Sequence, residues 1–234
     1  MNNLSFLTSF LLLLFLVSCQ EMDDRPIQHK SANGGIQYGG VFHSNEVENF
    51  KSLYPHNAGD ISSYNIGSQI YEGLVRLDPQ TLEVIPGIAK SWDISDDGME
   101  YIFHLREGVY FHDDPCFDDG IGRELDVEDC IFSLTMLLTH NSAINDYYTM
   151  VVDRIEGARR FYDLSDTDSP LEKVSGINRI DNNTLQIILT KPFPGFTKIL
   201  ATASCWIFPK EAYEMYGEEM RVHCVGTGPF RVVK

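Results

Sequence analysis

Hydrophobic and polar residues alternate most clearly between residues 92 and 111. Trp92 and Ile94 begin the alternation, and Asp96-Asp97-Gly98 follows as a hairpin turn, because Asp and Gly tolerate the positive φ of tight turns. The next strand points its apolar side chains to one face: Tyr101, Phe103 and Leu105. A second turn, at residues 106–108, leads into Val109-Tyr110-Phe111. The pattern predicts a β-meander whose aromatic face packs on another layer.

Helical spacing predicts four helices. One covers residues 62–74, with Tyr64, Ile70, Tyr71 and Leu74 as its apolar points. A second begins at Asp126, which is a good N-cap, and its buried stripe is Val127, Ile131, Leu134 and Leu138. Two short helices are expected within residues 194–201 and 210–216.

Further strands complete the expected body. They lie at residues 35–42, 174–180 and 184–189, and Asp181-Asn182-Asn183 joins the last two as a hairpin. Residues 163–173 are polar and predict a loop. Gly226-Thr227-Gly228-Pro229 predicts a turn that leads into a strand at 230–234. Strands mixed with scattered helices indicate an α/β fold of the mixed α+β kind.

The N-terminus has the pattern of an export signal. The uncharged run from Leu4 to Val17 is short for a bilayer span and fits the apolar region of a secretory signal. It ends at Cys19, in a sequence typical of bacterial lipoprotein processing, which predicts a signal peptide at 1–18 and a lipidated Cys19. An ordinary signal peptide with an incidental cysteine is the alternative. Residues 19–34 are polar and predict a flexible tether.

The net charge bears on the binding partners of the protein, and the cysteine content bears on its disulfides. The formal net charge of −16 disfavours nucleic acid as a partner. Four cysteines remain beyond Cys19, and an exported chain meets an oxidising compartment, where disulfides form: Cys116, Cys130, Cys205 and Cys224. Sequence order suggests Cys116 with Cys130 and Cys205 with Cys224, but three pairings exist, and buried free thiols are an equal alternative.

No motif predicts catalysis, a metal or a cofactor. His112-Asp113-Asp114 holds metal-ligating residue types, but three adjacent residues converge poorly on one ion, so a turn at the end of a strand is the better interpretation. Gly226-Thr227-Gly228 has neither the lysine nor the following helix of a phosphate loop. The chain contains no G-x-S-x-G motif, and no histidine lies at a zinc-like spacing from its cysteines.

Several stretches together resemble one protein family. The first is "YEGLVRLDPQTLEVIPGIAKSWDISDDGMEYIFHLREGVYFHD", and the others, in order, are "LDVEDCIFSL", "INRIDNNTLQIILTKPFPGF", "IFPKEAYEMYG" and "VGTGPFRVVK". They resemble the bacterial extracellular solute-binding proteins of family 5, the oligopeptide- and dipeptide-binding components of ABC importers. The resemblance covers about residues 35–234.

The resemblance implies a periplasmic-binding-protein-like lobe of type II, with no enzymatic activity and no cofactor. The implied division is a first lobe at 35–77 and 177–234, with a small β-rich subdomain inserted at 78–176. Family members continue into a second lobe beyond the Gly-Thr-Gly-Pro turn, so we expect an N-terminal fragment that binds weakly alone. The implied ligand segment is Phe42, His43, Ser44 and Asn45.

The implied partners are a peptide ligand, the permease subunits of an ABC transporter, and a membrane reached through the lipid anchor. A monomer in the cell envelope, facing the periplasm or the exterior, is expected. Other solutes of the family, namely nickel, haem or a sugar, remain as alternatives. A surface hydrolase or an adhesive lipoprotein is the alternative from a different class.

Overall fold

The structure is a computed structural model that describes residues 45–140, 146–167 and 173–232, together with residues 30, 31, 37, 38, 40 and 43. It divides into two units, Met1–Asn45 and Glu46–Lys234. In the first unit, β1 (Lys30–Ser31) pairs antiparallel with β2 (Gln37–Tyr38). The strand predicted at 35–42 overlaps β2. The predicted signal peptide and Cys19 lie outside the described residues.

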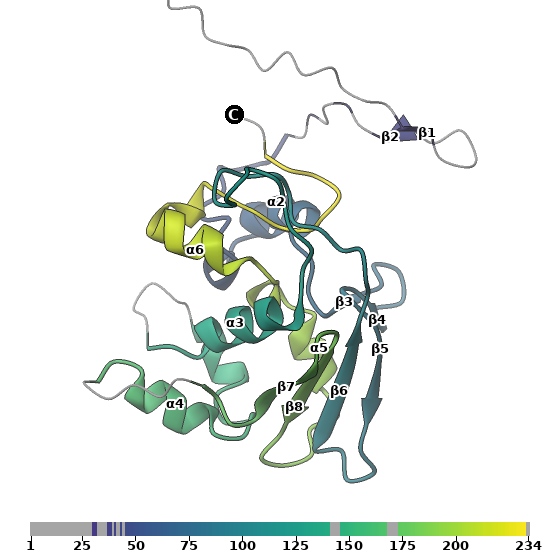
Figure 1. The fold of residues 1–234 in the computed structure, drawn as a ribbon, viewed down its shortest axis with the longest axis vertical. Helices are drawn as coiled ribbons and strands as arrows, with labels where there is room; N and C mark the ends of the chain where they lie inside the picture. Colours follow the sequence, from purple (N-terminus) through teal and green to yellow (C-terminus); the bar gives the residue numbers. More distant parts are fainter. Residues whose placement is uncertain are drawn as a thin grey trace, which may run out of the picture. The chain divides into compact units, whose positions relative to one another are not determined.

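A four-stranded antiparallel sheet organises the second unit (Figure 1). Its strands are β5 (Ala89–Ile94), β6 (Glu100–Leu105), β7 (Ile177–Asp181) and β8 (Thr184–Ile188), in the order β5-β6-β8-β7. A smaller sheet pairs β3 (Val75–Leu77) with β4 (Val84–Pro86). Because β8 pairs with β6, residues 177–188 lie in the same sheet as residues from the segment 78–176. The division into a lobe and an inserted subdomain stays a prediction.

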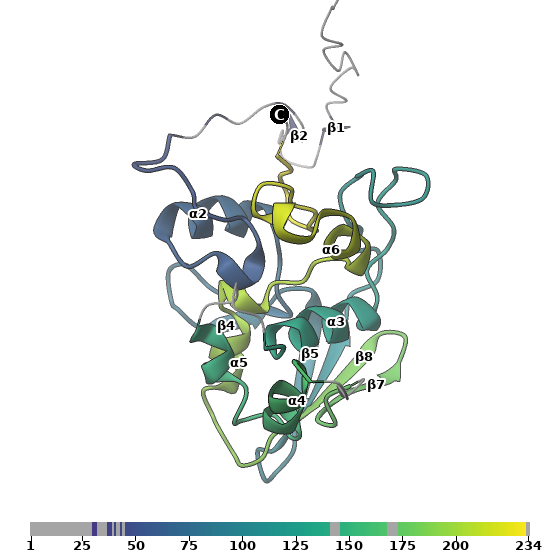
Figure 2. The ribbon, with the colours of Figure 1, turned by 90° about the vertical axis from the view of Figure 1, so that its left-hand side faces the viewer.

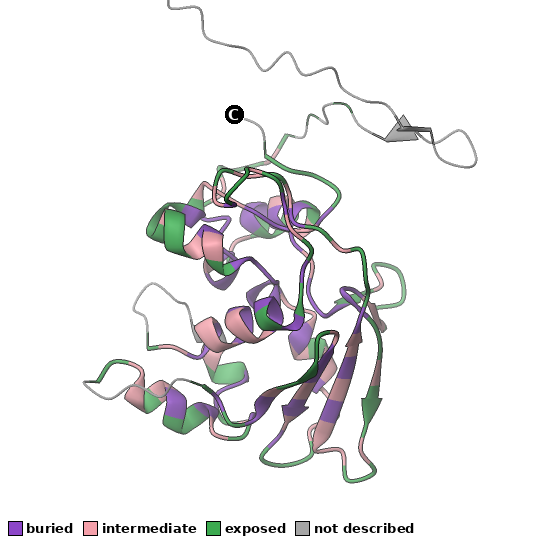
Figure 3. Ribbon diagram, viewed as in Figure 1, coloured by how far each residue is buried: buried purple, intermediate pink, exposed green. Residues whose placement is uncertain are grey.

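The β5-β6 and β7-β8 hairpins and the aromatic face of β6 are confirmed. The third strand of the predicted meander is wrong, because β6 pairs with β8 and Tyr110 forms only an isolated bridge with Glu124. Figure 3 shows burial alternating along β6, where Tyr101, Phe103 and Leu105 are at most 2% exposed. Gly98 has φ +70° in the first turn, and the Asp97 carboxylate accepts the amide of Met99 at 3.0 Å. In the second hairpin, Asp181 accepts the amide of Asn183 at 2.8 Å. Each turn is therefore held by its own aspartate.

Helix α3 (Val127–Leu137) packs on the sheet beside β7 and β8 (Figure 1). Its start is a capping box, in which Asp126 accepts the amides of Glu128 and Asp129 while Asp129 accepts the amide of Asp126. The predicted N-cap is confirmed. In the predicted stripe, Val127, Leu134 and Leu138 are buried and Ile131 is partly buried.

The remaining helices are short. They are α4 (Ala158–Leu164), α5 (Phe196–Leu200), α6 (Lys210–Tyr216) and the 3-10 turns η1 (Pro55–Asn57), η2 (Asp146–Met150), η3 (Ala203–Cys205) and η4 (Gly217–Arg221). The predicted helices near α5 and α6 are confirmed, whereas α4 has no counterpart among the predicted helices. Figure 2 shows α2 and α6 at the end of the unit opposite the tip of the β5-β6 hairpin.

Helix α2 (Ile61–Ile70) is shorter than the predicted helix at 62–74. Tyr71 is already extended, with φ −110° and ψ 154°, and Gly73 forms an antiparallel bridge with Trp206. The carbonyl groups at the end of the helix are hydrogen-bonded by a distant segment, since the carbonyl of Ile70 accepts the amide of Gly228 at 2.8 Å. Residues 71–74 leave the helix because strand-like pairing with residues 206–207 replaces helical hydrogen bonds.

The strand predicted at 230–234 is wrong for its described part. Residues 230–232 belong to no strand. The amide of Phe230 donates instead to the carbonyl of Gln69 at 3.0 Å, at the end of α2. This segment satisfies carbonyls that a helix leaves without internal partners.

Two hydrophobic clusters stabilise the second unit. The sheet core lies between α3 and the four-stranded sheet and includes Phe103, Leu134, Ile187 and Phe196. The second cluster, here called the α2 core, consists of Leu53, Tyr54, Ala58, Ile70, Tyr71, Ala203, Trp206, Phe208 and Met220. Among the described residues, no helix has both the length and the apolar character needed to cross a bilayer.

Candidate functional site

The predicted ligand segment lies at the boundary of the first unit. Phe42 and Ser44 fall outside the described residues, and His43 and Asn45 are exposed. The boundary between the two units follows Asn45. The assignment of Phe42, His43, Ser44 and Asn45 to ligand binding therefore stays a prediction.

His56 is a fully buried titratable group that the sequence did not single out. Its side chain is 0% exposed in the α2 core, and its ring packs edge-on against Phe208 with centroids 5.3 Å apart. Nδ1 lies 3.1 Å from the Tyr54 hydroxyl, whereas Nε2 makes no regular hydrogen bond with any described residue. Burial lowers the pKa of His56 to about 3, although the nearby Ser133 backbone acts in the opposite direction. A neutral imidazole closed off from solvent is a core residue rather than a ligand contact.

An aromatic stack runs from the surface into the α2 core. Trp206 lies between Tyr64 and Tyr71, with ring centroids 5.6 and 5.9 Å away. Gly67 makes the stack fit, because a Cβ there would stand 2.5 Å from the Trp206 ring. Tyr64, one of the apolar points of the predicted helix, is 47% exposed. It covers Trp206 from the solvent side.

His112 fastens the Gly-Thr-Gly-Pro turn. Its Nε2–H donates to the carbonyl of Gly228 at 2.8 Å, and its Nδ1 accepts the amide of Gly226 at 3.4 Å. Burial lowers the pKa of His112, which favours the neutral ring that can both donate and accept. Both glycines are required, because a Cβ at either would stand less than 3 Å from the carbonyl oxygen of Ile70. The predicted turn is confirmed.

The two aspartates that follow His112 serve the local loop. Asp113 accepts the amide of Gly122 at 3.0 Å, while Asp114 accepts the amide of Cys116 at 2.9 Å and the Tyr216 hydroxyl at 2.7 Å. The carboxylates are thus committed to different partners. In the described part of the chain, no group of three or more His, Cys, Asp or Glu side chains is placed to hold a metal ion.

The four described cysteines are free thiols in this structure. Cys130 and Cys205 are buried, and Cys116 and Cys224 are partly buried. The pairings suggested by sequence order, Cys116 with Cys130 and Cys205 with Cys224, are not formed. Burial raises the pKa of each thiol, which disfavours the reactive thiolate.

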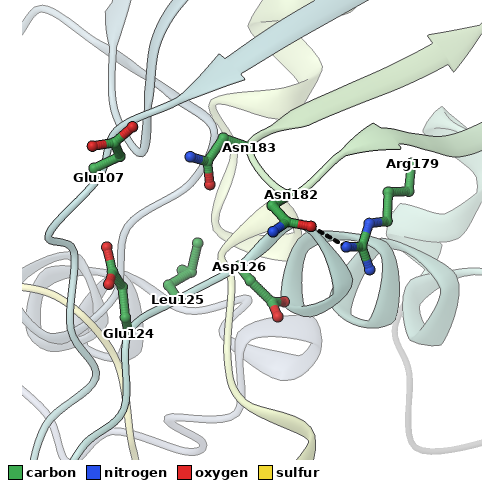
Figure 4. A pocket seen from close by; sticks show the side chains of 7 residues that line it. All are labelled: Glu107, Glu124, Leu125, Asp126, Arg179, Asn182 and Asn183. Carbon is green, nitrogen blue, oxygen red and sulfur yellow. Dashed lines mark hydrogen bonds between the residues drawn. The ribbon is translucent and has the colours of Figure 1, made fainter.

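A pocket of about 520 Å³ lies beside the start of α3 (Figure 4). It is lined by Glu107, Glu124, Leu125, Asp126, Arg179, Asn182 and Asn183. Most of its charged groups already have structural partners. Glu124 accepts the amide of Gly108, and Asp126 caps α3.

Arg179, the one cation among the residues that line this pocket, is also engaged. It bonds to Asn182, as Figure 4 shows, and pairs with Glu128 at 3.1 Å. Most of the residues that line the pocket carry carboxylate or amide side chains. The lining contains no pair of a nucleophile and a base. The pocket therefore offers hydrogen-bonding groups but no catalytic arrangement among the described residues.

Comparisons with known proteins identify the family. Residues 83–234 match the family model described as bacterial extracellular solute-binding proteins, family 5 Middle. The dipeptide-binding protein of Escherichia coli K12 is 33% identical over 168 residues, which is 70% of this chain and 29% of that protein. Heme-binding protein A of Haemophilus influenzae is 30% identical over 175 residues, which is 72% of this chain and 30% of that protein.

A solved structure extends the likeness to the fold. The periplasmic oligopeptide-binding protein of an oligopeptide ABC transporter from Borrelia burgdorferi is similar with a TM-score of 0.63 and 31% identity. The match covers 78% of this chain and 35% of that one, so the chain spans about a third of these relatives. The fold is a mixed α/β fold of the type II periplasmic-binding-protein kind, and the relatives are solute-binding proteins rather than enzymes. The chain belongs to the bacterial extracellular solute-binding proteins of family 5.

Proposed function

We propose that this chain forms the N-terminal part of a lipid-anchored substrate-binding protein that captures extended peptides and delivers them to the permease of an ABC importer. The family match over residues 83–234 carries the proposal. The names of the dipeptide-binding relative and of the oligopeptide-binding structure support peptides as the solute. A monomer is the expected state.

Peptide capture in this proposal depends on main-chain hydrogen bonds. Proteins that bind an extended peptide as an added strand recognise its backbone, which all peptides share, so affinity depends little on side chains. Phe42, His43, Ser44 and Asn45 are the residues proposed to offer this edge. His43 and Asn45 are exposed, as a ligand contact requires in a protein without its ligand.

Tight binding is proposed to need a second lobe. The first lobe would comprise residues 35–77 and 177–234, with residues 78–176 as an inserted subdomain, and closure of two lobes by hinge motion would enclose the peptide. The relatives are about three times as long as the matched segment, which leaves room for that lobe. The 234-residue chain alone is therefore expected to bind peptides weakly.

Isothermal titration with mixed di- to pentapeptides tests this proposal. The dipeptide-binding relative from E. coli serves as the positive control, and the 234-residue chain is expected to show no micromolar binding. Micromolar affinity of this chain would refute the requirement for a second lobe. A protein extended to the relatives' length that still ignored peptides would refute the choice of solute.

The lipid anchor rests on Cys19 and is tested separately. Bacteria expressing the chain with labelled palmitate should incorporate the label and retain the protein in the membrane fraction, facing the periplasm or the exterior. Cys19→Ala should lose both properties. Cys205→Ala is the matched control, because it removes a cysteine outside the predicted signal. Equal labelling of the wild type and Cys19→Ala would refute the anchor.

Haem is the second candidate solute, and the similarity to heme-binding protein A favours it. Titration of the extended protein with haemin, followed by absorbance, separates it from peptide binding. A saturable spectral change that peptides do not displace would favour haem. Displacement of bound haem by peptides would indicate that both solutes occupy the same site.

A further inference from the structure

Asp114 bonds to the backbone of Cys116 and acts electrostatically on Cys224. Its Oδ1 accepts the amide of Cys116 at 2.9 Å and the Tyr216 hydroxyl at 2.7 Å. Burial and then the Asp114 carboxylate raise the pKa of the Cys116 thiol to about 12. Burial and then the same carboxylate also raise the pKa of the Cys224 thiol to about 12. Both sulfur atoms therefore lie within electrostatic reach of one carboxylate.

Hydrogen bonds bring the two chain segments together. The amide of His112 donates to the carbonyl of Gly226 at 2.9 Å, and the His112 ring bonds to Gly226 and Gly228. Cys116 follows His112 by four residues, and Cys224 precedes Gly226 by two. The amide of Phe117 donates to the carbonyl of Asp114 at 3.1 Å, so a tight turn folds Cys116 back over Asp114.

Tyr216 joins the same two segments from the side. Its hydroxyl bonds to Asp114, and its ring stacks on His223, the neighbour of Cys224, with centroids 4.7 Å apart and planes 7° from parallel. One side chain thus contacts the residue before Cys224 and the carboxylate beside Cys116. This contact places the segment that carries Cys224 beside the loop that carries Cys116.

The other two cysteines are less suited to pairing. Cys130 is 0% exposed and Cys205 is 2% exposed, and the Cys205 sulfur lies 4.0 Å from the Thr202 hydroxyl. Disulfides form by attack of a thiolate on another disulfide, which requires access to the sulfur. Cys116 and Cys224 are the partly exposed pair.

We propose that Cys116 and Cys224 form an intramolecular disulfide that fastens the loop at 112–124 to the segment before the Gly226 turn. This rests on the export of the chain in the proposed function, because disulfides persist in oxidising compartments. It replaces both pairings suggested by sequence order. The bond would link the loop beside the sheet core, where Cys116 packs, to the α2 core, where Cys224 packs.

The chemistry requires an oxidant of the disulfide class, either a thiol–disulfide oxidoreductase or glutathione disulfide. One thiolate attacks the oxidant's disulfide to give a mixed disulfide, and the second thiolate displaces the oxidant's remaining sulfur. The two protein thiols lose two protons and two electrons, and the oxidant is reduced to two thiols. Because both thiols have raised pKa values, the reaction is expected to be slow without a catalyst.

The test uses the full chain with Cys19→Ser, so that only the four remaining thiols react. The reduced protein is incubated in a glutathione redox buffer with an oxidoreductase, digested without reduction and analysed by mass spectrometry. A cross-linked peptide pair that contains Cys116 and Cys224 is expected. The oxidised protein is expected to melt about 10 °C above the reduced protein, since the bond closes a loop on the order of 100 residues.

Matched cysteine variants distinguish the effect of the Cys116–Cys224 disulfide from other effects of oxidation. Cys116→Ser, Cys224→Ser and the double variant should each lose the oxidation-dependent rise in melting temperature. Cys205→Ala should keep it. Cross-links that follow sequence order, or four thiols that still alkylate after oxidation, would overturn the proposal. Peptide titration of the extended protein in both redox states tests the proposed function independently, so the two proposals fail separately.

Discussion

Acid should destabilise this protein through His56. The unfolded chain binds a proton at His56 near pH 6.5, whereas burial keeps the folded-state pKa at about 3. Between these pH values the unfolded state binds more protons than the folded state. The contribution of neutral His56 to the free energy of unfolding is therefore fully present above pH 6.5 and decreases as the pH is lowered toward 3. Each pH unit in this window costs about 1.4 kcal/mol, which gives about 2 kcal/mol at pH 5. That is a large fraction of the stability of a typical domain.

The substitution His56→Phe isolates this effect. Phenylalanine fills the space beside Phe208 but has no titrating group, and the Tyr54 hydroxyl loses its partner, a cost of about 1–3 kcal/mol that does not depend on pH in this range. We therefore expect the variant to be less stable at pH 7.5, with a shallower loss of stability between pH 7.5 and pH 5.

Urea unfolding followed by fluorescence measures both profiles. His43→Phe is the matched control, because it replaces an exposed histidine, and it should keep the wild-type slope. The difference between wild type and His56→Phe should change by about 2 kcal/mol from pH 7.5 to pH 5. Parallel pH profiles of wild type and His56→Phe would refute the reasoning, because His56 would then titrate alike in both states.

Three further substitutions test other contacts. Arg123→Met should lower the free energy of unfolding by about 2–3 kcal/mol in urea titrations, because Asp129, 3% exposed, loses a guanidinium bonded at 2.7 and 2.8 Å. Gly67→Ala should lower the melting temperature by an amount equivalent to about 1–3 kcal/mol, because its Cβ would strike the Trp206 ring. His112→Ala should speed amide exchange in the 226–228 turn, measured by hydrogen exchange, while β6 stays protected.

Each of these substitutions has a control. Arg159→Met breaks an exposed pair with Asp153 and should change stability little. Ser68→Ala adds no atom against Trp206 and should leave the melting temperature nearly unchanged. Equal loss in Arg123→Met and Arg159→Met, or in Gly67→Ala and Ser68→Ala, would contradict the corresponding contact. Uniform faster exchange in His112→Ala would mean that the histidine stabilises the whole unit rather than the turn.

The candidate site was only partly predictable from the sequence. The order of motifs indicated the family, because each motif is a local sequence pattern. The burial of His56 was not predictable, since nothing near Tyr54-Pro55-His56 specifies that Phe208 would cover it. The contacts between the Cys116 loop and the Cys224 segment were also not predictable, because the Tyr216 and His112 hydrogen bonds join residues about 100 positions apart in sequence.

The sequence by itself determined the elements whose stabilising partners are local. The β5-β6 hairpin arises from alternation and a turn aspartate, and the start of α3 from Asp126 and Asp129 three residues later. Only the tertiary structure decided where α2 ends and what the last described residues do. Helix propensity extends past Ile70, but the amides of Gly228 and Phe230 take the carbonyls at the helix end, and residues 206–207 pair with residues 72–73. Hydrogen-bond partners so distant in sequence leave no periodic pattern, so their effect appears only once the chain has folded.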